Sequence, residues 1–282
     1  MKTQASVDAS SAPRLTRRVL DSLPLRTLHE ARNWSKADVY LSEWPPQSGR
    51  KVVVKDFKKR ALWFRIVAGR YFLRREWHAL RVLDGTPGVP RAIAKPDADS
   101  LVVEYVRGEA LSEIPRRTIS DATMDRLENL VRTLHERGVT HGDLHLENIL
   151  VDEEGNVAML DWATAHVFNH RNKAQQWLFE EWQALDLRAV AKVKLYHARH
   201  RVNEHDRELL EGGSRSYRFI KSLRRTSDKM RGKKSSGRLE RAIKKVKAQA
   251  EQAAAANSGA PTPQAPRTPN APQASTQNEG DK

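Results

Sequence analysis

The first hundred residues alternate short apolar runs with residues that form turns. Residues 39–41 (Val-Tyr-Leu) and 52–54 (Val-Val-Val) are rich in β-branched and aromatic side chains, and Pro-Pro-Gln-Ser-Gly at 45–49 separates them. Such runs, bounded by turn formers, are typical of paired strands. A later run at 101–103 (Leu-Val-Val) has the same character. The pattern predicts a hairpin and a further strand.

A stretch between these strands has helical periodicity. Residues 61–83 contain no proline, and their large apolar residues recur at helical spacing, namely Phe72, Trp77, Leu80 and Leu83. Recurrence every three to five residues is typical of an amphipathic helix. Gly69 is the position where the stretch could divide into two helices. We therefore predict one major helical insertion in a strand-rich first part.

After Pro115 the pattern becomes helical again. Ser120 or Asp121 stands where a helix cap is expected, and Gly138 stands where the helix should stop. The apolar residues of one face are Met124, Leu127, Val131 and Leu134. A helix is predicted here, and a further helical segment is predicted at 182–197.

Two short apolar runs, at 149–151 and 157–160, follow the segment 141–148, which reads His-Gly-Asp-Leu-His-Leu-Glu-Asn. Asp143 and Asn148 are five residues apart, and Asp161 ends the second run. This order and spacing resemble the catalytic loop and the following hairpin of the protein-kinase-like superfamily. The resemblance covers roughly residues 30–200, and it implies an α+β, two-lobed protein-kinase-like fold with a small β-rich N-lobe and a mostly helical C-lobe.

The resemblance implies a role for each polar residue of this segment. Asp143 would be the catalytic residue that orients the acceptor hydroxyl. Asn148 and Asp161 would be the metal ligands, since amide and carboxylate oxygens suit Mg²⁺ or Mn²⁺. His141 and His145 are four residues apart but have no evident third ligand, so zinc is a weak alternative.

The upstream half would bind the ATP. Lys55, which follows the run 52–54, and Glu76, on the predicted helix, would form the pair that holds the α- and β-phosphates. Glu104 and Val106 lie where the superfamily joins its lobes and would bind adenine through backbone groups. Where a glycine-rich loop is expected, residues 33–38 contain no glycine, so Ser35 and Lys36 are predicted to contact phosphate instead.

The chain also departs from ordinary protein kinases after its metal ligand. Asp161 is followed by Trp-Ala, Gly142 replaces the usual arginine, and no Ala-Pro-Glu follows. A C-lobe without a full activation segment is therefore expected. Such reduction resembles two relatives, the Rio-type atypical Ser/Thr kinases and the bacterial lipopolysaccharide-core sugar kinases.

Charge and composition add expectations about partners and location. Residues 50–75 hold ten Lys/Arg against one acid, and residues 214–247 hold fourteen against two. Such patches attract polyanions. An anionic membrane surface is therefore a candidate partner, while nucleic acid is weaker because no base-reading motif is present. With no cysteine and no long apolar run, a cytoplasmic protein, peripheral at the inner membrane at most, is expected.

Taken together, the sequence predicts four regions: an N-terminal extension at 1–29, a kinase-like domain at 30–213 (N-lobe about 30–103, C-lobe about 107–213), a basic extension at 214–247, and a disordered Ala/Pro-rich tail at 248–282. The expected function is ATP- and Mg²⁺-dependent phosphorylation of a hydroxyl on a protein or glycolipid acceptor. A Rio-like serine/threonine kinase is the first interpretation. The alternatives are a lipopolysaccharide-core sugar kinase and a nucleotide-binding pseudokinase.

Overall fold

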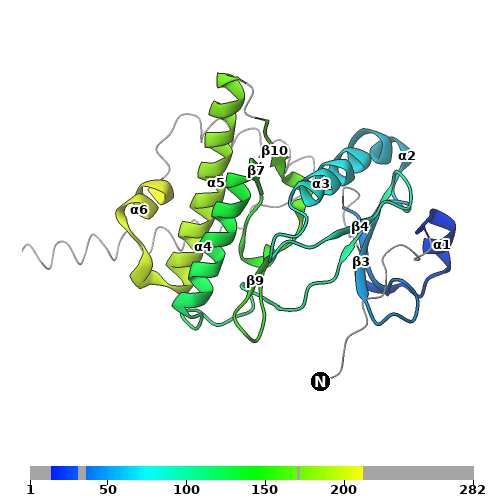
Figure 1. Ribbon diagram of the computed structural model, residues 1–282, viewed down its shortest axis with the longest axis horizontal. Coiled ribbons are helices and arrows are strands. Elements are labelled where there is room, and N and C mark those ends of the chain that lie inside the picture. Colours follow the sequence, from blue (N-terminus) through cyan, green and yellow to red (C-terminus); the bar gives the residue numbers. More distant parts are fainter. Residues whose placement is uncertain (1–13, 31–35, 170–171, 212–282) are drawn as a thin grey trace, which may run out of the picture. The chain divides into compact units, whose positions relative to one another are not determined.

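The computed structural model describes residues 14–30, 36–169 and 172–211 (Figure 1). The predicted basic extension, the predicted tail and Ser35 lie outside the described residues. Within the described ranges, no helix combines the length and the apolar character that crossing a bilayer requires.

A five-stranded antiparallel sheet forms the first lobe. Its strands, in spatial order, are β1 (Arg26–His29), β2 (Asp38–Glu43), β3 (Lys51–Asp56), β5 (Ser100–Glu104) and β4 (Ala92–Ala94). The predicted hairpin is confirmed, because β2 pairs with β3 along its whole length and Trp44 to Arg50 closes the turn. The predicted strand at 101–103 is the centre of β5.

The segment before β2 is part of this lobe. Helix α1 (Arg17–Ser22) precedes β1, and the predicted boundary at residue 29 falls between β1 and β2, which are paired. Leu15 and Leu20 are buried, and they pack in a small core with residues of the sheet, namely Trp44, Val52, Val54 and Val102. The apolar side chains of Leu15 and Leu20 therefore belong to the core of this lobe.

The predicted helical insertion is one continuous run made of α2 (Leu62–Phe64), a π-helix (Arg65–Gly69) and α3 (Arg70–Val82). Gly69 does not break the run. It ends the π-helix, where a Cβ atom would lie 3.3 Å from the ring of Phe57. Glycine therefore allows close packing here.

The second lobe is mostly helical. Its helices are α4 (Asp121–Glu136), α5 (Lys173–His197) and α6 (Glu204–Glu211), and its short strands are β6 (Glu109–Ala110), β7 (Val139–Thr140), β8 (Ile149–Val151), β9 (Val157–Met159) and β10 (His166–Val167). Single 3₁₀ turns occur at 146–148, 162–164 and 199–201. Strands β6, β8 and β9 form one small sheet, and β7 pairs with β10.

The predicted cap and stop of α4 are both present. The Ser120 hydroxyl accepts a hydrogen bond from the Thr123 amide at 3.1 Å, and Gly138 has φ +69° just beyond the helix. The main hydrophobic core extends from α3 through α4 to α5. The two-lobed α+β architecture predicted from the sequence is thus the one observed, and it places most of the predicted site residues between the lobes.

Candidate active site

A cavity of about 500 Å³ lies between the strand-rich and the helical lobe. Seven of the nine predicted site residues line it, namely Lys36, Lys55, Glu76, Glu104, Val106, Asn148 and Asp161. They come from the segment between β1 and β2, from β3, α3 and the end of β5, and from the segments around β8 and β9. Asp143 is not among the lining residues, and Ser35 lies outside the described part of the chain.

Lys55 and Glu76 form an ion pair inside this cavity. The Lys55 Nζ lies 2.6 Å from the Glu76 Oε1 and 3.6 Å from the Asp161 Oδ1. Burial lowers the pKa of Lys55, but the two carboxylates outweigh it, so the pKa is raised and the ammonium stays charged. Burial also raises the pKa of Glu76, and Lys55 acts in the opposite direction.

Helix α3 explains why a glutamate is buried at this point. Leu73, Glu76 and Leu80 lie at helical spacing on its buried face. The Glu76 carboxyl therefore points inward with the apolar residues, where a cation or hydrogen-bond donors must compensate its lost hydration. Lys55 on β3 supplies that cation from the neighbouring sheet.

One edge of the cavity is formed by residues 104–106, at the end of β5. The Glu104 amide donates to the Arg91 carbonyl at 2.9 Å, and the Tyr105 amide donates to the Lys51 carbonyl at 3.2 Å. The Glu104 side chain reaches the residue before β4, since its Oε2 accepts a hydrogen bond from the Arg91 amide at 3.1 Å. Residues 104–106 line the cavity, and the amides of Glu104 and Tyr105 are already hydrogen-bonded within the lobe.

The glycine-free segment between β1 and β2 reaches the cavity through Lys36 and Ala37. Arg60 holds its end, because Arg60 Nε donates to the Lys36 carbonyl at 2.9 Å and its guanidinium pairs with the buried Asp38. Conventional phosphate loops rely on flexible glycine backbone. Here a side-chain clamp fixes the position of the chain instead.

The loop 141–148 lies on the opposite side of the cavity. The Asn148 side-chain nitrogen donates to the Asp143 carbonyl at 3.0 Å, and the Leu160 amide donates to the Asn148 carbonyl at 2.8 Å. These bonds bring Asn148 beside Asp161. Asp143 is only 3% exposed, so its carboxyl is shielded from water in this structure.

Asp161 adopts an uncommon backbone conformation at the mouth of the cavity. Its φ and ψ are +64° and +68°, in the left-handed region that aspartate tolerates better than most residues. Its side chain is 50% exposed. The following Trp162 is buried, donates from its indole nitrogen to the Met159 carbonyl at 3.0 Å, and packs on His141.

Asp186 on α5 is a site residue that the sequence reasoning missed. Its carboxylate accepts hydrogen bonds from the His141 amide at 2.7 Å and the Gly142 amide at 2.9 Å, and His135 Nε2 lies 3.3 Å away. It is 1% exposed. An acid on the inward face of an apolar helix was the available signal, because such an acid needs donors.

Gly142 has a geometric reason to be glycine. Its φ is +74°, and a Cβ atom there would lie 2.8 Å from the Thr164 carbonyl oxygen and 3.0 Å from the Trp182 ring. No side chain fits without moving backbone. The residue is therefore explained by packing between the loop 141–148 and the segment after Asp161.

Arg75 on α3 is a second missed residue. Its guanidinium donates to the carbonyls of Thr164 at 2.7 Å and Ala165 at 2.8 Å, and it contacts the ring nitrogens of His166 at 2.9 and 3.0 Å. Burial and the Arg75 charge lower the pKa of His166 to about 3. The sequence analysis counted Arg75 as part of a basic surface patch, whereas the structure turns it inward.

Among the described residues, no three His, Cys, Asp or Glu side chains form a cluster that could hold a metal ion alone. The predicted ligands still fit Mg²⁺ bound together with phosphates, which needs only one or two protein oxygens. Asp161 and Asn148 both line the cavity. Because the nitrogen of the Asn148 amide is used within the loop, its oxygen is the atom left for a cation.

The family model of the protein kinase domain matches residues 46–184. CBL-interacting serine/threonine-protein kinase 13 of Arabidopsis thaliana is 40% identical over 72 residues, which are 24% of this chain and 14% of that protein. CBL-interacting protein kinase 16 of Oryza sativa subsp. japonica is 32% identical over 127 residues, 42% of this chain and 27% of that protein. The chain thus spans a small part of these curated relatives.

Among solved structures, the chain is similar to the Rio2 kinase-ADP/Mg²⁺-phosphoaspartate complex from Chaetomium thermophilum, with a TM-score of 0.48 and 18% identity over 79% of this chain and 65% of that chain. The family match and the two-lobed architecture agree. The chain therefore contains a domain of the protein-kinase-like superfamily, and the predicted fold class is confirmed. The match to the protein kinase family model also supports the predicted enzyme class, a kinase.

Proposed function

We propose that this protein transfers the γ-phosphoryl group of ATP to a hydroxyl acceptor, with Mg²⁺ as the metal. The observation that carries the proposal is the contact of Lys55 with both Glu76 and Asp161 in one cavity. Phosphoryl transfer requires little covalent work from the protein, so positioned charges provide most of the catalysis. A buried cation beside a half-exposed carboxylate matches that requirement.

The nucleotide would bind across the cavity. We assign adenine to the backbone of Glu104 and Val106, and we assign the phosphates to Lys55 and Lys36, which line the same cavity. Glu76 would hold the Lys55 ammonium in place through their hydrogen bond of 2.6 Å. Asn148 and Asp161 would hold the metal, which supplies charge neutralisation for the β- and γ-phosphates.

Asp143 would orient the acceptor hydroxyl. The backbone around it is fixed from three sides, by Asp186, by His141, whose ring contacts the Leu160 carbonyl at 2.9 Å, and by Asn148. Precise placement of this kind lowers the entropic part of the barrier. Since Asp143 is almost fully buried, the acceptor would have to displace neighbouring groups to reach it.

We propose a serine or threonine of a protein as the acceptor, as expected for a Rio-like atypical kinase. The support is that the curated relatives matched include serine/threonine-protein kinases of plants and Dictyostelium discoideum. A sugar hydroxyl of a lipopolysaccharide core is the second candidate. The observation in its favour is the exposed apolar side chains of Trp63 and Val67, on the helical run that leads into α3.

The test is transfer of label from γ-labelled ATP with Mg²⁺, offering a protein extract and purified lipopolysaccharide in separate reactions. We expect label in protein that is sensitive to alkali, as phosphoserine is. An Asp143→Asn variant that labels neither acceptor would exclude a contaminating kinase. A wild type that binds ATP but labels neither acceptor would favour the pseudokinase.

A further inference from the structure

The helical run that leads into α3 exposes large apolar side chains. Leu62, Trp63, Ile66, Val67 and Tyr71 are 61, 60, 53, 72 and 55% exposed. We call these five residues the apolar face. They belong to α2, the π-helix and the start of α3, which lie along one edge of the strand-rich lobe (Figure 1). An apolar surface of this size usually serves an interaction.

The π-helix keeps this face continuous. The buried residues Phe64 and Gly69 are five positions apart across it, whereas Gly69, Leu73 and Glu76 follow at the usual four and three. A π-turn contains one extra residue. Among the exposed positions, Tyr71 lies five residues after Ile66 and four after Val67. The turn thus holds the buried residues inward and the apolar face outward.

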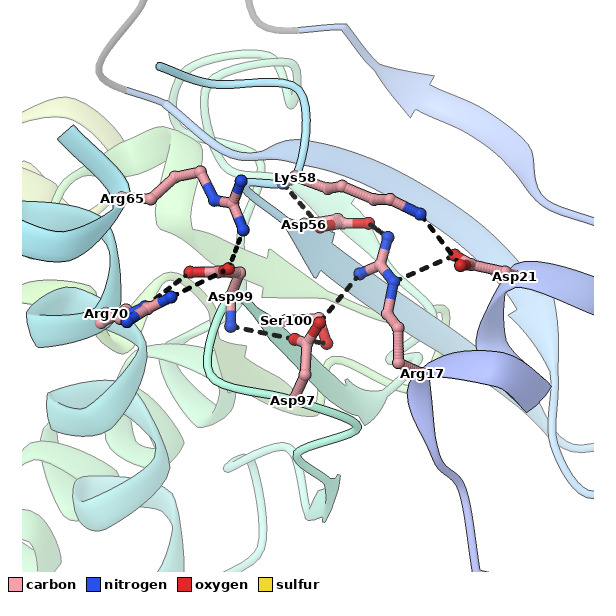
Figure 2. A network of polar contacts seen from close by, with 9 residues as sticks. All are labelled: Arg17, Asp21, Asp56, Lys58, Arg65, Arg70, Asp97, Asp99 and Ser100. Atoms are coloured by element: carbon pink, nitrogen blue, oxygen red, sulfur yellow. Dashed lines mark hydrogen bonds and ion pairs between the residues drawn. The ribbon is translucent and has the colours of Figure 1, made fainter. Parts of the chain in front are cut away.

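Two arginines of the helical run bind the residue that precedes β5. Figure 2 shows Arg65 and Arg70 converging on Asp99, just before β5, with Arg70 Nε 2.9 Å from Asp99 Oδ1. Burial raises the pKa of Asp99, but the two guanidinium groups outweigh it and lower the pKa. The carboxylate therefore stays charged, and the apolar face is held in its outward position by a buried ionic contact.

These contacts also revise the charge of the region. Arg65 and Arg70 are bound to Asp99, and Arg75 is bound to backbone carbonyls. Lys59 and Arg74 are exposed. Because residues 57–75 contain no acid, the exposed Lys59 and Arg74 leave this segment with positive charge, although less than the sequence count predicts.

We propose that the apolar face is a docking surface for an anionic lipid bilayer. Leu62, Ile66 and Val67 would enter the boundary between headgroups and acyl chains, and Trp63 and Tyr71 would lie at the depth that aromatic rings prefer. Lys59 and Arg74 would contact anionic headgroups. A second copy fits less well, because a two-fold contact would bring the same cations of each copy together.

This inference goes beyond the proposed function, because bilayer docking requires neither nucleotide nor transfer. Its test is flotation of the full chain with phosphatidylcholine vesicles and with vesicles that also contain phosphatidylglycerol. We expect binding to the anionic vesicles that weakens as salt rises. The double variant Ile66→Ser/Val67→Ser should bind at least about tenfold more weakly, since several buried CH₂ groups are lost.

The matched control is Leu178→Ser/Leu187→Ser, which removes two apolar side chains, each 37% exposed, from α5. This control should float like the wild type. Both variants should keep the wild-type melting temperature, because all four residues are exposed. Equal flotation of the Ile66→Ser/Val67→Ser variant and the wild type would overturn the proposal. A wild type that does not float with anionic vesicles at low salt would also overturn it.

Two further measurements separate the alternatives. Brominated lipids should quench tryptophan emission of the wild type more than that of Trp63→Phe, and equal quenching would overturn insertion at this face. Sedimentation without lipid should show the same mass for the wild type and the double variant. A wild-type dimer that the double variant abolishes, without vesicle binding, would assign the face to a second copy.

Discussion

The guanidinium of Arg75 on α3 donates a hydrogen bond of 2.8 Å to the carbonyl of Ala165, four residues after Asp161. Glu76, the next residue on the same helix, holds Lys55 at 2.6 Å. Neighbouring residues of one helix therefore hold both the lysine and the backbone that follows Asp161, the proposed metal ligand. The two halves of the proposed site are coupled mechanically through α3.

This coupling predicts the behaviour of Arg75→Met. Without the guanidinium, the segment 164–166 loses its anchor, and the position of Asp161 relative to Lys55 is less defined. We expect transfer to fall about tenfold or more, in line with other losses of orientation. Steady-state kinetics with ATP as the varied substrate measures it. Charge reversal at the exposed Arg74, one residue earlier, should leave the rate unchanged, and an equal loss there would contradict the coupling.

Substitution of Asp143 separates binding from chemistry. Asp143→Asn should abolish transfer and leave ATP affinity within a factor of about two, because Asp143 does not line the cavity. Calorimetry with ATP and Mg²⁺ measures the affinity. A large loss of binding together with activity would show that the role assigned to Asp143 is wrong.

The elements and residue pairs that local pattern defines could be predicted from the sequence. The hairpin, the strand at 101–103, the cap at Ser120 and the joint presence of Lys55, Glu76, Asn148 and Asp161 in one cavity all belong here. Each depends on short-range periodicity or on motif spacing. The roles of these residues in catalysis stay predictions.

Contacts between distant segments could not be predicted. Asp186 lies more than forty positions from the amides that it binds, and nothing in the helical pattern around it indicates which donors it meets. Arg75 and Arg70 look like surface cations in the sequence, yet they bind a carbonyl and a buried carboxylate. Strand β1 is exposed at every residue, so no alternation marks it.

Asp186 provides a stability prediction. Asp186→Asn should destabilise the fold by about 3 kcal/mol, because a buried charge-assisted acceptor of two backbone amides becomes a weaker one that also brings an unmatched donor. Urea denaturation followed by circular dichroism measures the change. The control Glu153→Gln, at an exposed turn, should lie within about 0.5 kcal/mol of the wild type. A similar urea midpoint for Asp186→Asn and Glu153→Gln would contradict the stabilising role assigned to the buried Asp186 carboxylate.

His166 predicts a pH dependence. Burial and Arg75 lower its pKa to about 3 in the folded state, while the unfolded chain protonates near 6.5. The unfolded state therefore binds more protons between these values, and stability falls as pH falls from about 6.5 toward 3, by about 1 kcal/mol per unit. His166→Gln should remove this part of the slope. Identical slopes for the variant and the wild type between pH 6 and pH 4 would contradict it.

The measurement that tests the central claim most directly is calorimetric titration of ATP into the wild type and into Asp161→Asn, with Mg²⁺ and with EDTA. If Asp161 and Asn148 hold the metal that joins the phosphates to Lys55, wild-type binding should weaken by at least about tenfold in EDTA. The variant should show the weaker affinity in both buffers. Wild-type affinity that is the same with Mg²⁺ and with EDTA would contradict a metal-dependent kinase site.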